Sequence, residues 1–260
     1  MPLLAALLAL GLALALPAQR TVLAPTGTLR ASFIATNPVQ GRVDARTGAT
    51  TGPGPDLARE LARRLGVPAV ISPLPDAGAV LESVKSGNVD IGFLALEAER
   101  ATQVDFSDPY SNSGAAYAVP ANSRFQKSAD VDRAGVMIGA IAGQSPEVYV
   151  REHVKNARVE SLPSVPPNAA IGKMLLDGKF DAFAANRTRM EEVVREVPGV
   201  RVLSDDYMVT SQAIVVPKGN ASRLAEVNRF LADVRASGFV KASLERANVA
   251  GVNVAPEPKR

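Results

Sequence analysis

The stretch that decides the fold is SGNVDIGFLA at residues 86–95, which recurs as DGKFDAFAAN at residues 177–186. In both copies a helical pattern ends at a glycine, an aspartate follows three residues later, and an apolar run begins directly after it. Such a glycine predicts the end of a helix, and a short apolar run predicts a buried strand. We interpret Asp90 and Asp181 as turn and cap residues. A chain that makes this unit twice is expected to form two similar lobes that face each other.

Strand and helix patterns alternate around both copies. Strands are expected at residues 28–34, 67–71, 89–94, 136–141, 157–161, 180–184, 200–203 and 213–216, and helices at 56–65, 79–85, 146–153, 168–176, 188–197, 222–237 and 240–247. Apolar strands that alternate with helices predict an α/β fold, in which each lobe is a mostly parallel sheet flanked by helices. The Pro-rich tail from Asn248 is expected to be loose.

Two extended segments, near Tyr117 and over residues 209–212, interrupt the alternation. We expect the chain to cross between the lobes at both places. Residues 21–117 and 212–260 would then form lobe 1, and residues 118–211 would form lobe 2, inserted between the two hinge crossings. Because paired crossings allow the lobes to close on each other, the sequence predicts a clamp for a small molecule.

The N-terminus differs in kind from the rest of the chain. Residues 3–16 are almost entirely Leu and Ala, a run shorter than the roughly 20 apolar residues that span a bilayer. This run predicts a signal peptide over residues 1–18, with the small residue Ala18 at the cleavage position. No Lys or Arg precedes the run, so the cleavage site stays open, and an uncleaved or lipid anchor is the alternative to cleavage. The expected compartment is the periplasm.

The composition narrows the chemistry. Of 260 residues 47% are hydrophobic, none is cysteine and one is histidine, so disulfides, cysteine nucleophiles and histidine-based metal sites are excluded. The net charge is only +3, and basic runs interleaved with aromatic residues are missing, which argues against a nucleic-acid partner. The sequence contains no HExxH, Walker or GxGxxG motif. We expect no metal, no cofactor and no catalytic residue.

Ligands of open parallel sheets bind beyond the carboxyl ends of the strands. This rule selects as ligand-binding candidates Asn37, Leu94, Ala95 and Arg100 in lobe 1 and Gly143, Gln144, Ser145 and Asn186 in lobe 2. The run from Gly143 opens a helix, whose first N–H groups favour an anion, and Arg100 can hold a carboxylate with two parallel bonds. The alternative for Arg100 is a surface arginine that pairs with Glu97 or Glu99.

Several motifs together resemble the bacterial extracellular solute-binding proteins of family 3, the periplasmic receptors of polar amino-acid ABC importers. The motifs are PDLARELARRLGV at residues 55–67, SGNVD at 86–90, Glu99-Arg100, DFSDPY at 105–110, GKFDA at 178–182 and VPKGN at 216–220. The resemblance implies a two-lobed type II periplasmic-binding fold that closes on its ligand. It also implies that Arg100 holds the ligand α-carboxylate and that Gln144 and Ser145 assist.

The chain departs from the family pattern around the ligand. No threonine stands between Leu94 and Arg100, and Asn186 replaces the acidic residue that binds the ligand ammonium. Aromatic residues are also missing near Asn37 and Ala77. We therefore expect a small carboxylate-bearing solute, an amino acid or a related organic acid, and Asn186 leaves open whether it has an α-amino group. The remaining candidates for an ammonium partner are Glu97, Asp76 and Asp206.

Two functions from different classes follow from the resemblance. The first is a monomeric solute receptor without chemistry of its own, which delivers its solute to the membrane permease of an ABC importer. The second is a periplasmic enzyme on the same fold, similar to cyclohexadienyl dehydratase, in which Glu97 or Glu147 would act as the acid. Turnover of prephenate or arogenate would identify the enzyme.

Overall fold

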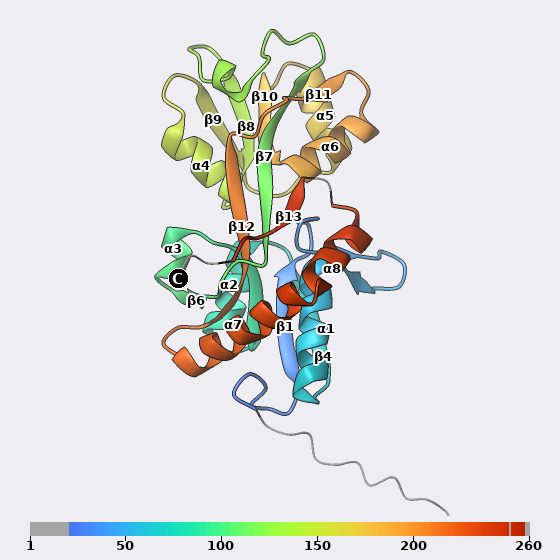
Figure 1. Cartoon of the computed structure of the whole chain (residues 1–260). Helices are drawn as coiled ribbons and strands as arrows, with labels where there is room; N and C mark the ends of the chain where they lie inside the picture. The colour runs from blue at the N-terminus through green and yellow to red at the C-terminus, as the bar shows by residue number, and fades with distance from the viewer. Residues whose placement is uncertain (1–20, 250, 258–260) are drawn as a thin grey trace, which may run out of the picture.

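The computed structural model describes residues 21–249 and 251–257. The helices and strands gather into two lobes, one above the other in Figure 1, and each lobe packs helices against a sheet. The predicted signal peptide at residues 1–18 lies outside the described residues. In the part of the chain that is described, no helix is both long and apolar enough to cross a membrane.

Lobe 1, the lower one in Figure 1, carries the described residues up to Phe106 and the two C-terminal helices. Its strands are β1 (Leu29–Ile34), β4 (Ala69–Leu74), β5 (Ile91–Ala95) and β6 (Val104–Phe106), beside the small hairpin β2 (Arg42–Val43) and β3 (Thr50–Thr51). Its helices are α1 (Pro53–Leu65), α2 (Ala77–Lys85), α3 (Ala98–Ala101), α7 (Ala221–Ala236) and α8 (Phe239–Ala247). The helix α3 and the strand β6 were not predicted from the sequence.

Lobe 2 carries the middle of the chain (Figure 1). Its strands are β8 (Met137–Ile141), β9 (Arg158–Leu162), β10 (Ala182–Asn186) and β11 (Val200–Val202). Its helices are α4 (Ser145–His153), α5 (Asn168–Leu176) and α6 (Arg187–Glu196), with a single 3-10 turn at Ser128–Asp130. The seven helices expected from the sequence all exist and begin within three residues of their predicted starts.

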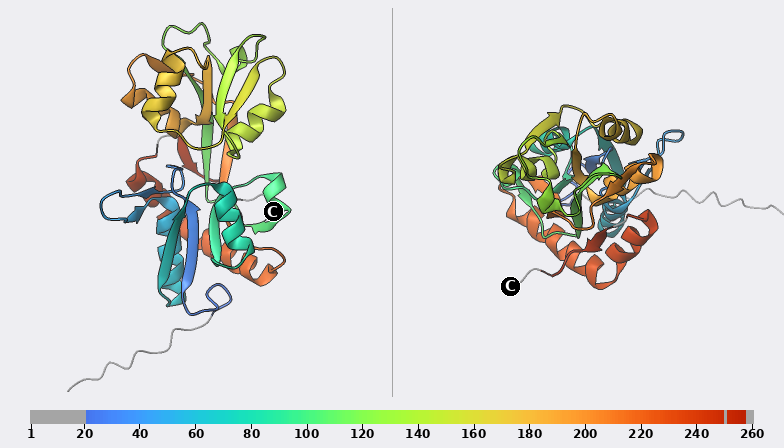
Figure 2. Two further views of the ribbon diagram at one scale, coloured as in Figure 1. Left: turned by 180° about the vertical axis from the view of Figure 1, so that it is seen from behind. Right: turned by 90° about the horizontal axis from the view of Figure 1, so that it is seen from above.

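Two long strands, β7 (Ser111–Pro120) and β12 (Met208–Pro217), run through both lobes (Figures 1 and 2). They pair antiparallel where the lobes meet, with Ser111 opposite Gln212 and Ala115 opposite Met208. The path through the curled sheet is therefore β4-β1-β5-β12-β7-β10-β8-β9. The strand expected at residues 213–216 begins five residues earlier, because its first half serves as a crossing. The lobe boundaries at 117/118 and 211/212 remain a prediction.

Separate apolar cores stabilise the two lobes. Phe33, Leu57 and Ile91 lie in the core of lobe 1, and Ile138 and Phe183 lie in cores of lobe 2. All five residues of β5 and all five of β10 are buried. Each of these strands pairs parallel with one neighbour and antiparallel with the other, and such burial is expected for inner strands covered on both faces. Since the cores are separate, the lobes can move relative to each other without breaking either one.

The repeated glycine and aspartate unit builds matching junctions in the two lobes. Asp90 accepts hydrogen bonds from the Arg30 backbone N–H at 2.9 Å and from its guanidinium at 2.7 and 3.0 Å. Asp181 accepts a bond from the Met137 N–H at 2.8 Å. Each carboxylate thus ties the start of a strand to its parallel neighbour. Both are structural residues, which agrees with their interpretation as turn residues, although neither caps a helix.

We expect Asp90→Asn to lower the free energy of unfolding more than Asp181→Asn does. Asp90 is completely buried and bonds to a guanidinium, and a hydrogen bond to a charged partner contributes about 1.5–3 kcal/mol. Asp181 is exposed, so its loss should cost about 1 kcal/mol or less. Urea unfolding of both variants checks this order, and equal losses would contradict it.

The part of the C-terminal tail that the structure describes is not loose, so this prediction was wrong there. Residues Val252–Val254 form β13, which pairs antiparallel with β7 at Ser111 and Ser113. The Ala255 N–H also donates to the Tyr110 carbonyl at 3.2 Å. The tail therefore adds a third strand where the chain crosses between the lobes, and Figure 1 shows β13 beside β7.

Candidate functional site

The lobes meet around a small polar cavity, here called the inner cavity, at the carboxyl ends of β1, β5 and β10. Lobe 1 lines it with Ile34, Asn37, Gln40, Ala77, Ala95 and Arg100, and lobe 2 lines it with Gln144, Ser145, Pro146 and Asn186. Thr210 and Gln212 of the crossing strand β12 complete the wall. Its volume is about 20 Å³, enough for a water molecule. A larger solute therefore needs the lobes to stand further apart than they do here.

Arg100 is half-buried at this cavity and bridges the lobes. Its guanidinium donates to the Ala95 carbonyl of its own lobe at 3.0 Å and to the Gly143 carbonyl of lobe 2 at 2.6 Å. Burial lowers the pKa of Arg100, and the nearby Glu97 and Glu99 carboxylates offset this only in part. The two hydrogen-bond acceptors of this cation are neutral carbonyl oxygens. A carboxylate in their place would form stronger hydrogen bonds, because it carries the opposite charge.

Four neutral polar side chains at the cavity each hold a buried atom without a hydrogen-bond partner. They are Ser145 Oγ, Asn186 Oδ1, Thr210 Oγ1 and Gln212 Nε2. Leaving a buried polar atom unpaired costs about 1–3 kcal/mol, so native proteins rarely gather several at one place. Their convergence beside Arg100 is what a site built for a polar ligand requires.

The structure brings most of the predicted site residues to this cavity. Asn37, Ala95, Arg100, Gln144, Ser145 and Asn186 all line it. Gly143 lies beside it and supplies the carbonyl that Arg100 bonds. Leu94 does not line it, because its fully buried side chain packs into a core of lobe 1. Successive side chains of a strand point to opposite faces, so Leu94 and its neighbour Ala95 cannot both face the cavity.

Sequence reasoning missed Gln40, Thr210 and Gln212. Thr210 and Gln212 stand two residues apart on β12, so they face the same side of the sheet. Two polar residues at this spacing, just before the apolar run from Ala213, were the available signal. Gln40 lies in the irregular segment after β1, where no periodic pattern identifies buried positions.

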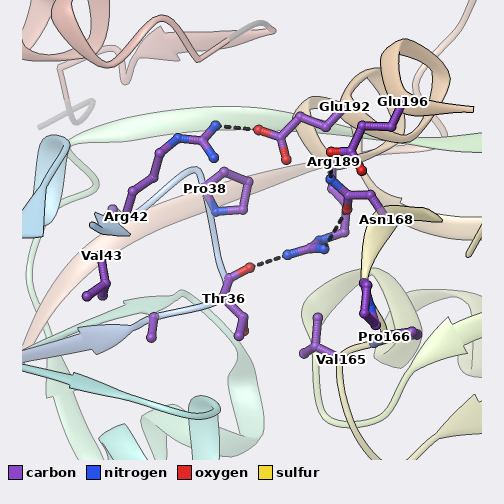
Figure 3. Close-up of a pocket in the computed structure, with 13 residues that line it drawn as sticks. Thr36, Pro38, Arg42, Val43, Val165, Pro166, Asn168, Arg189, Glu192 and Glu196 are labelled. Atoms are coloured by element: carbon purple, nitrogen blue, oxygen red, sulfur yellow. Dashed lines mark hydrogen bonds and ion pairs between the residues drawn. The ribbon is translucent and has the colours of Figure 1, made fainter. Parts of the chain in front are cut away.

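Two larger chambers flank the inner cavity between the lobes. The first, here called the β2 chamber, has a volume of about 490 Å³ and includes Thr36, Arg42, Asn168, Arg189 and Glu192 (Figure 3). The second, the α2 chamber, has a volume of about 500 Å³ and includes Asp76, Gly143 and Gln144. Of the two, the α2 chamber shares Ala77 and Gln144 with the inner cavity, so it has room for the remainder of a solute whose polar end occupies that cavity.

An ion pair and a hydrogen bond join the two lobes across the β2 chamber, as Figure 3 shows. Arg42 of lobe 1 pairs with Glu192 of lobe 2. Arg189 of lobe 2 donates to the Thr36 carbonyl of lobe 1 and, at 3.0 Å, to Asn168 Oδ1. Burial lowers the pKa of Arg189. The Arg42–Glu192 and Arg189–Thr36 contacts join the two lobes and would break if the lobes separated, whereas the Arg189–Asn168 bond lies within lobe 2.

We expect Arg42→Gln to weaken solute binding by about 2- to 5-fold, which corresponds to the roughly 0.5–1 kcal/mol of an exposed ion pair. The Arg42 side chain is 48% exposed, so the effect stays small. Loss of the pair with Glu192 disfavours the closed state and lowers the apparent affinity. Calorimetric titration measures it, with the exposed Arg46→Gln as control. Unchanged affinity in Arg42→Gln would mean that this pair plays no part in closure.

The carboxylates proposed for chemistry or for an ammonium partner are engaged elsewhere or lie outside the inner cavity. Glu147 is buried and accepts bonds from the Gly143 N–H at 3.2 Å and the Ser161 hydroxyl at 2.5 Å. Asp76 caps α2 through the Ala79 N–H at 2.8 Å. Asp206 pairs with Arg187 at 2.6 Å. Across residues 21–249 and 251–257, no group of three metal-ligating side chains occurs.

Comparison with protein families matches residues 33–247 to the bacterial extracellular solute-binding proteins, family 3. The L-cystine-binding protein TcyJ of Escherichia coli K12 is 28% identical over 203 residues, which are 76% of this chain and 74% of TcyJ. The cyclohexadienyl dehydratase of Pseudomonas aeruginosa is 26% identical over 196 residues, 73% of this chain and 71% of the enzyme.

Solved structures give the same fold. An ancestral arginine-binding protein bound to glutamine is 27% identical and superposes with a TM-score of 0.71 over 86% of this chain and 98% of its own. The substrate-binding protein AbpA of Streptococcus pneumoniae, bound to L-arginine, is 23% identical with a TM-score of 0.72 over 85% and 94% of the two chains. The predicted two-lobed type II periplasmic-binding fold is confirmed.

Proposed function

The chain belongs to the bacterial extracellular solute-binding proteins of family 3, and we propose that it captures a small carboxylate-bearing solute for an ABC importer by lobe closure. The solute is an amino acid or a related organic acid. Two relatives support solute capture by their names, since TcyJ is an L-cystine-binding protein and AbpA is bound to L-arginine.

The observation that carries this proposal is the environment of Arg100. Its guanidinium lies between the lobes and bonds only weaker, neutral acceptors. Burial without a carboxylate partner is costly for a cation. A solute carboxylate would supply the missing charge, and unpaired atoms of Ser145 and Gln212 lie around it.

The polar groups that would contact the solute belong to both lobes, so binding favours closure of the lobes. Arg100 belongs to lobe 1, Ser145 and Asn186 belong to lobe 2, and Gln212 lies on the strand that joins the lobes. A solute that contacts all of them binds the closed state better than the open state, and therefore shifts the population toward closure. A membrane permease would then recognise the closed form of a monomeric receptor that has been exported to the periplasm.

Binding without turnover is favoured over the dehydratase. Glu147, one candidate acid, directs both carboxylate oxygens to groups of its own lobe. The other, Glu97, is half-buried beside Arg100 and does not line the inner cavity. We expect purified protein to leave prephenate and arogenate unchanged. Conversion of either compound would contradict the receptor and identify the protein as an enzyme.

Native mass spectrometry of protein purified without denaturation tests the proposal. We expect an adduct of low mass that releases an organic acid, because closed lobes bury the solute and slow its escape. Calorimetric titration of the stripped protein with that acid should then give saturable binding. Protein that carries no acid and binds no carboxylate would contradict the proposal.

A further inference from the structure

A chain of side-chain amides fixes how Gln212 faces the inner cavity. The Ile34 backbone N–H donates to Gln40 Oε1 at 2.9 Å, so the Gln40 amide nitrogen must point the other way. That nitrogen donates to Gln212 Oε1 at 3.0 Å. The remaining atom, Gln212 Nε2, is buried and unpartnered, and it belongs to a side chain that lines the cavity. The cavity thus presents a fixed neutral donor.

A second amide chain fixes Asn186 with the opposite polarity. The Val39 N–H donates to Asn37 Oδ1 at 3.1 Å, which makes this oxygen an acceptor. Asn186 Nδ2 donates to the same oxygen across the lobes at 3.4 Å. Asn186 Oδ1 is left buried, unpartnered and at the cavity. Here the cavity presents a fixed neutral acceptor.

The inner cavity carries a positive charge and no negative charge among the described side chains that line it. Arg100 is the single charged side chain among its lining residues. Asp76 lines the α2 chamber while it caps a helix, and Glu97 lies beside the guanidinium. Glu147 accepts bonds from the Gly143 N–H and the Ser161 hydroxyl, and no carboxylate lines the inner cavity in the described residues. An ammonium group placed at Asn186 would therefore find an amide oxygen without a negative charge. Desolvating a cation costs several kcal/mol, which a neutral acceptor does not restore.

We propose that the inner cavity selects an organic anion whose second polar group is a neutral hydrogen-bond donor, such as a hydroxyl, rather than an ammonium. This inference rests on the proposed solute capture and deepens it. Arg100 and Gln212 Nε2 donate to the carboxylate, and Asn186 Oδ1 accepts from the hydroxyl. Gln212 and Asn186 are then the residues that determine specificity, and Gln40 and Asn37 act as positioning residues that orient them.

Matched pairs of acids test this selection. Each pair shares its side chain and differs only at C2: glycolate and glycine, L-lactate and L-alanine, L-phenyllactate and L-phenylalanine, L-2-hydroxyglutarate and L-glutamate. We expect calorimetry to give at least about 10-fold tighter binding of the hydroxy acid in the pair that fits best. An amino acid that binds as well as its hydroxy acid overturns the inference and leaves the receptor intact. If neither series binds, the proposed carboxylate receptor fails as well.

Asn186→Asp provides the decisive variant. It places a carboxylate where the second polar group binds, so we expect the preference within each pair to shift toward the amino acid by about 10-fold or more. The exposed Asn253→Asp adds the same charge away from the cavity and should leave the preference unchanged. Because the readout is a ratio of two affinities in one variant, partial misfolding does not affect it. An unshifted ratio in Asn186→Asp would overturn the role of this residue.

Discussion

Replacing Arg100 with glutamine is expected to weaken solute binding by about 30-fold to several thousand-fold. Removing one partner of a desolvated, hydrogen-bonded charge pair costs about 2–5 kcal/mol, which converts to this range. The solute carboxylate would be left between the lobes without its cation. Calorimetric titration with the solute released from the wild-type protein measures the loss.

The same substitution separates binding from stability. In the free protein the Arg100 guanidinium is half-buried with carbonyl acceptors only, and replacing such a charge by a neutral group is often harmless to stability. We therefore expect the melting temperature of the unliganded Arg100→Gln protein to be no lower than that of the wild type. The exposed Arg229→Gln controls for net charge and should retain full affinity. Full affinity in Arg100→Gln would remove the basis of the proposed function.

Phe183→Ala is expected to lower the free energy of unfolding of lobe 2 by about 3–5 kcal/mol. The Phe183 ring is fully buried and meets Phe180 edge to face at 5.9 Å. A Cβ on Gly139 would lie only 2.7 Å from this ring, so the backbone of β8 packs directly against it. Truncation therefore leaves a cavity in the middle of lobe 2.

Urea unfolding of Phe183→Ala should show lobe 2 melting before lobe 1, since the cores of the lobes are separate. β10 continues from Phe183 to Asn186 at the inner cavity, so solute affinity should fall as well. Val209→Ala, at a residue 62% exposed, is the control and should change stability by less than about 0.5 kcal/mol. A single unfolding transition shifted no further than in this control would contradict the separate cores.

Local sequence signals predicted most of the fold and part of the site. The glycine and aspartate units placed β5 and β10, because a helix end followed by a short apolar run is encoded within about ten residues. Ala95 and Asn186 are the last residues of these strands, so predicting the strands also predicted these two site residues. Ser145 was found in the same way, since Pro146 marks the first turn of α4.

The features that were missed depend on partners far away in the chain. Gln212 reaches the cavity because β12 pairs with both β5 and β7, and its amide is oriented by Gln40. β13 is a strand because β7 offers it a free edge. Neither relation leaves a pattern within a short window of sequence, so tertiary pairing had to be seen in the structure.

The most direct test of the central claim is a crystal structure of the protein with the solute it carries. We expect the solute carboxylate between the lobes, about 2.7–2.9 Å from the Arg100 guanidinium nitrogens, where the Gly143 carbonyl now accepts. A solute bound outside the inner cavity, or an Arg100 side chain directed to bulk water in the loaded protein, would contradict the account.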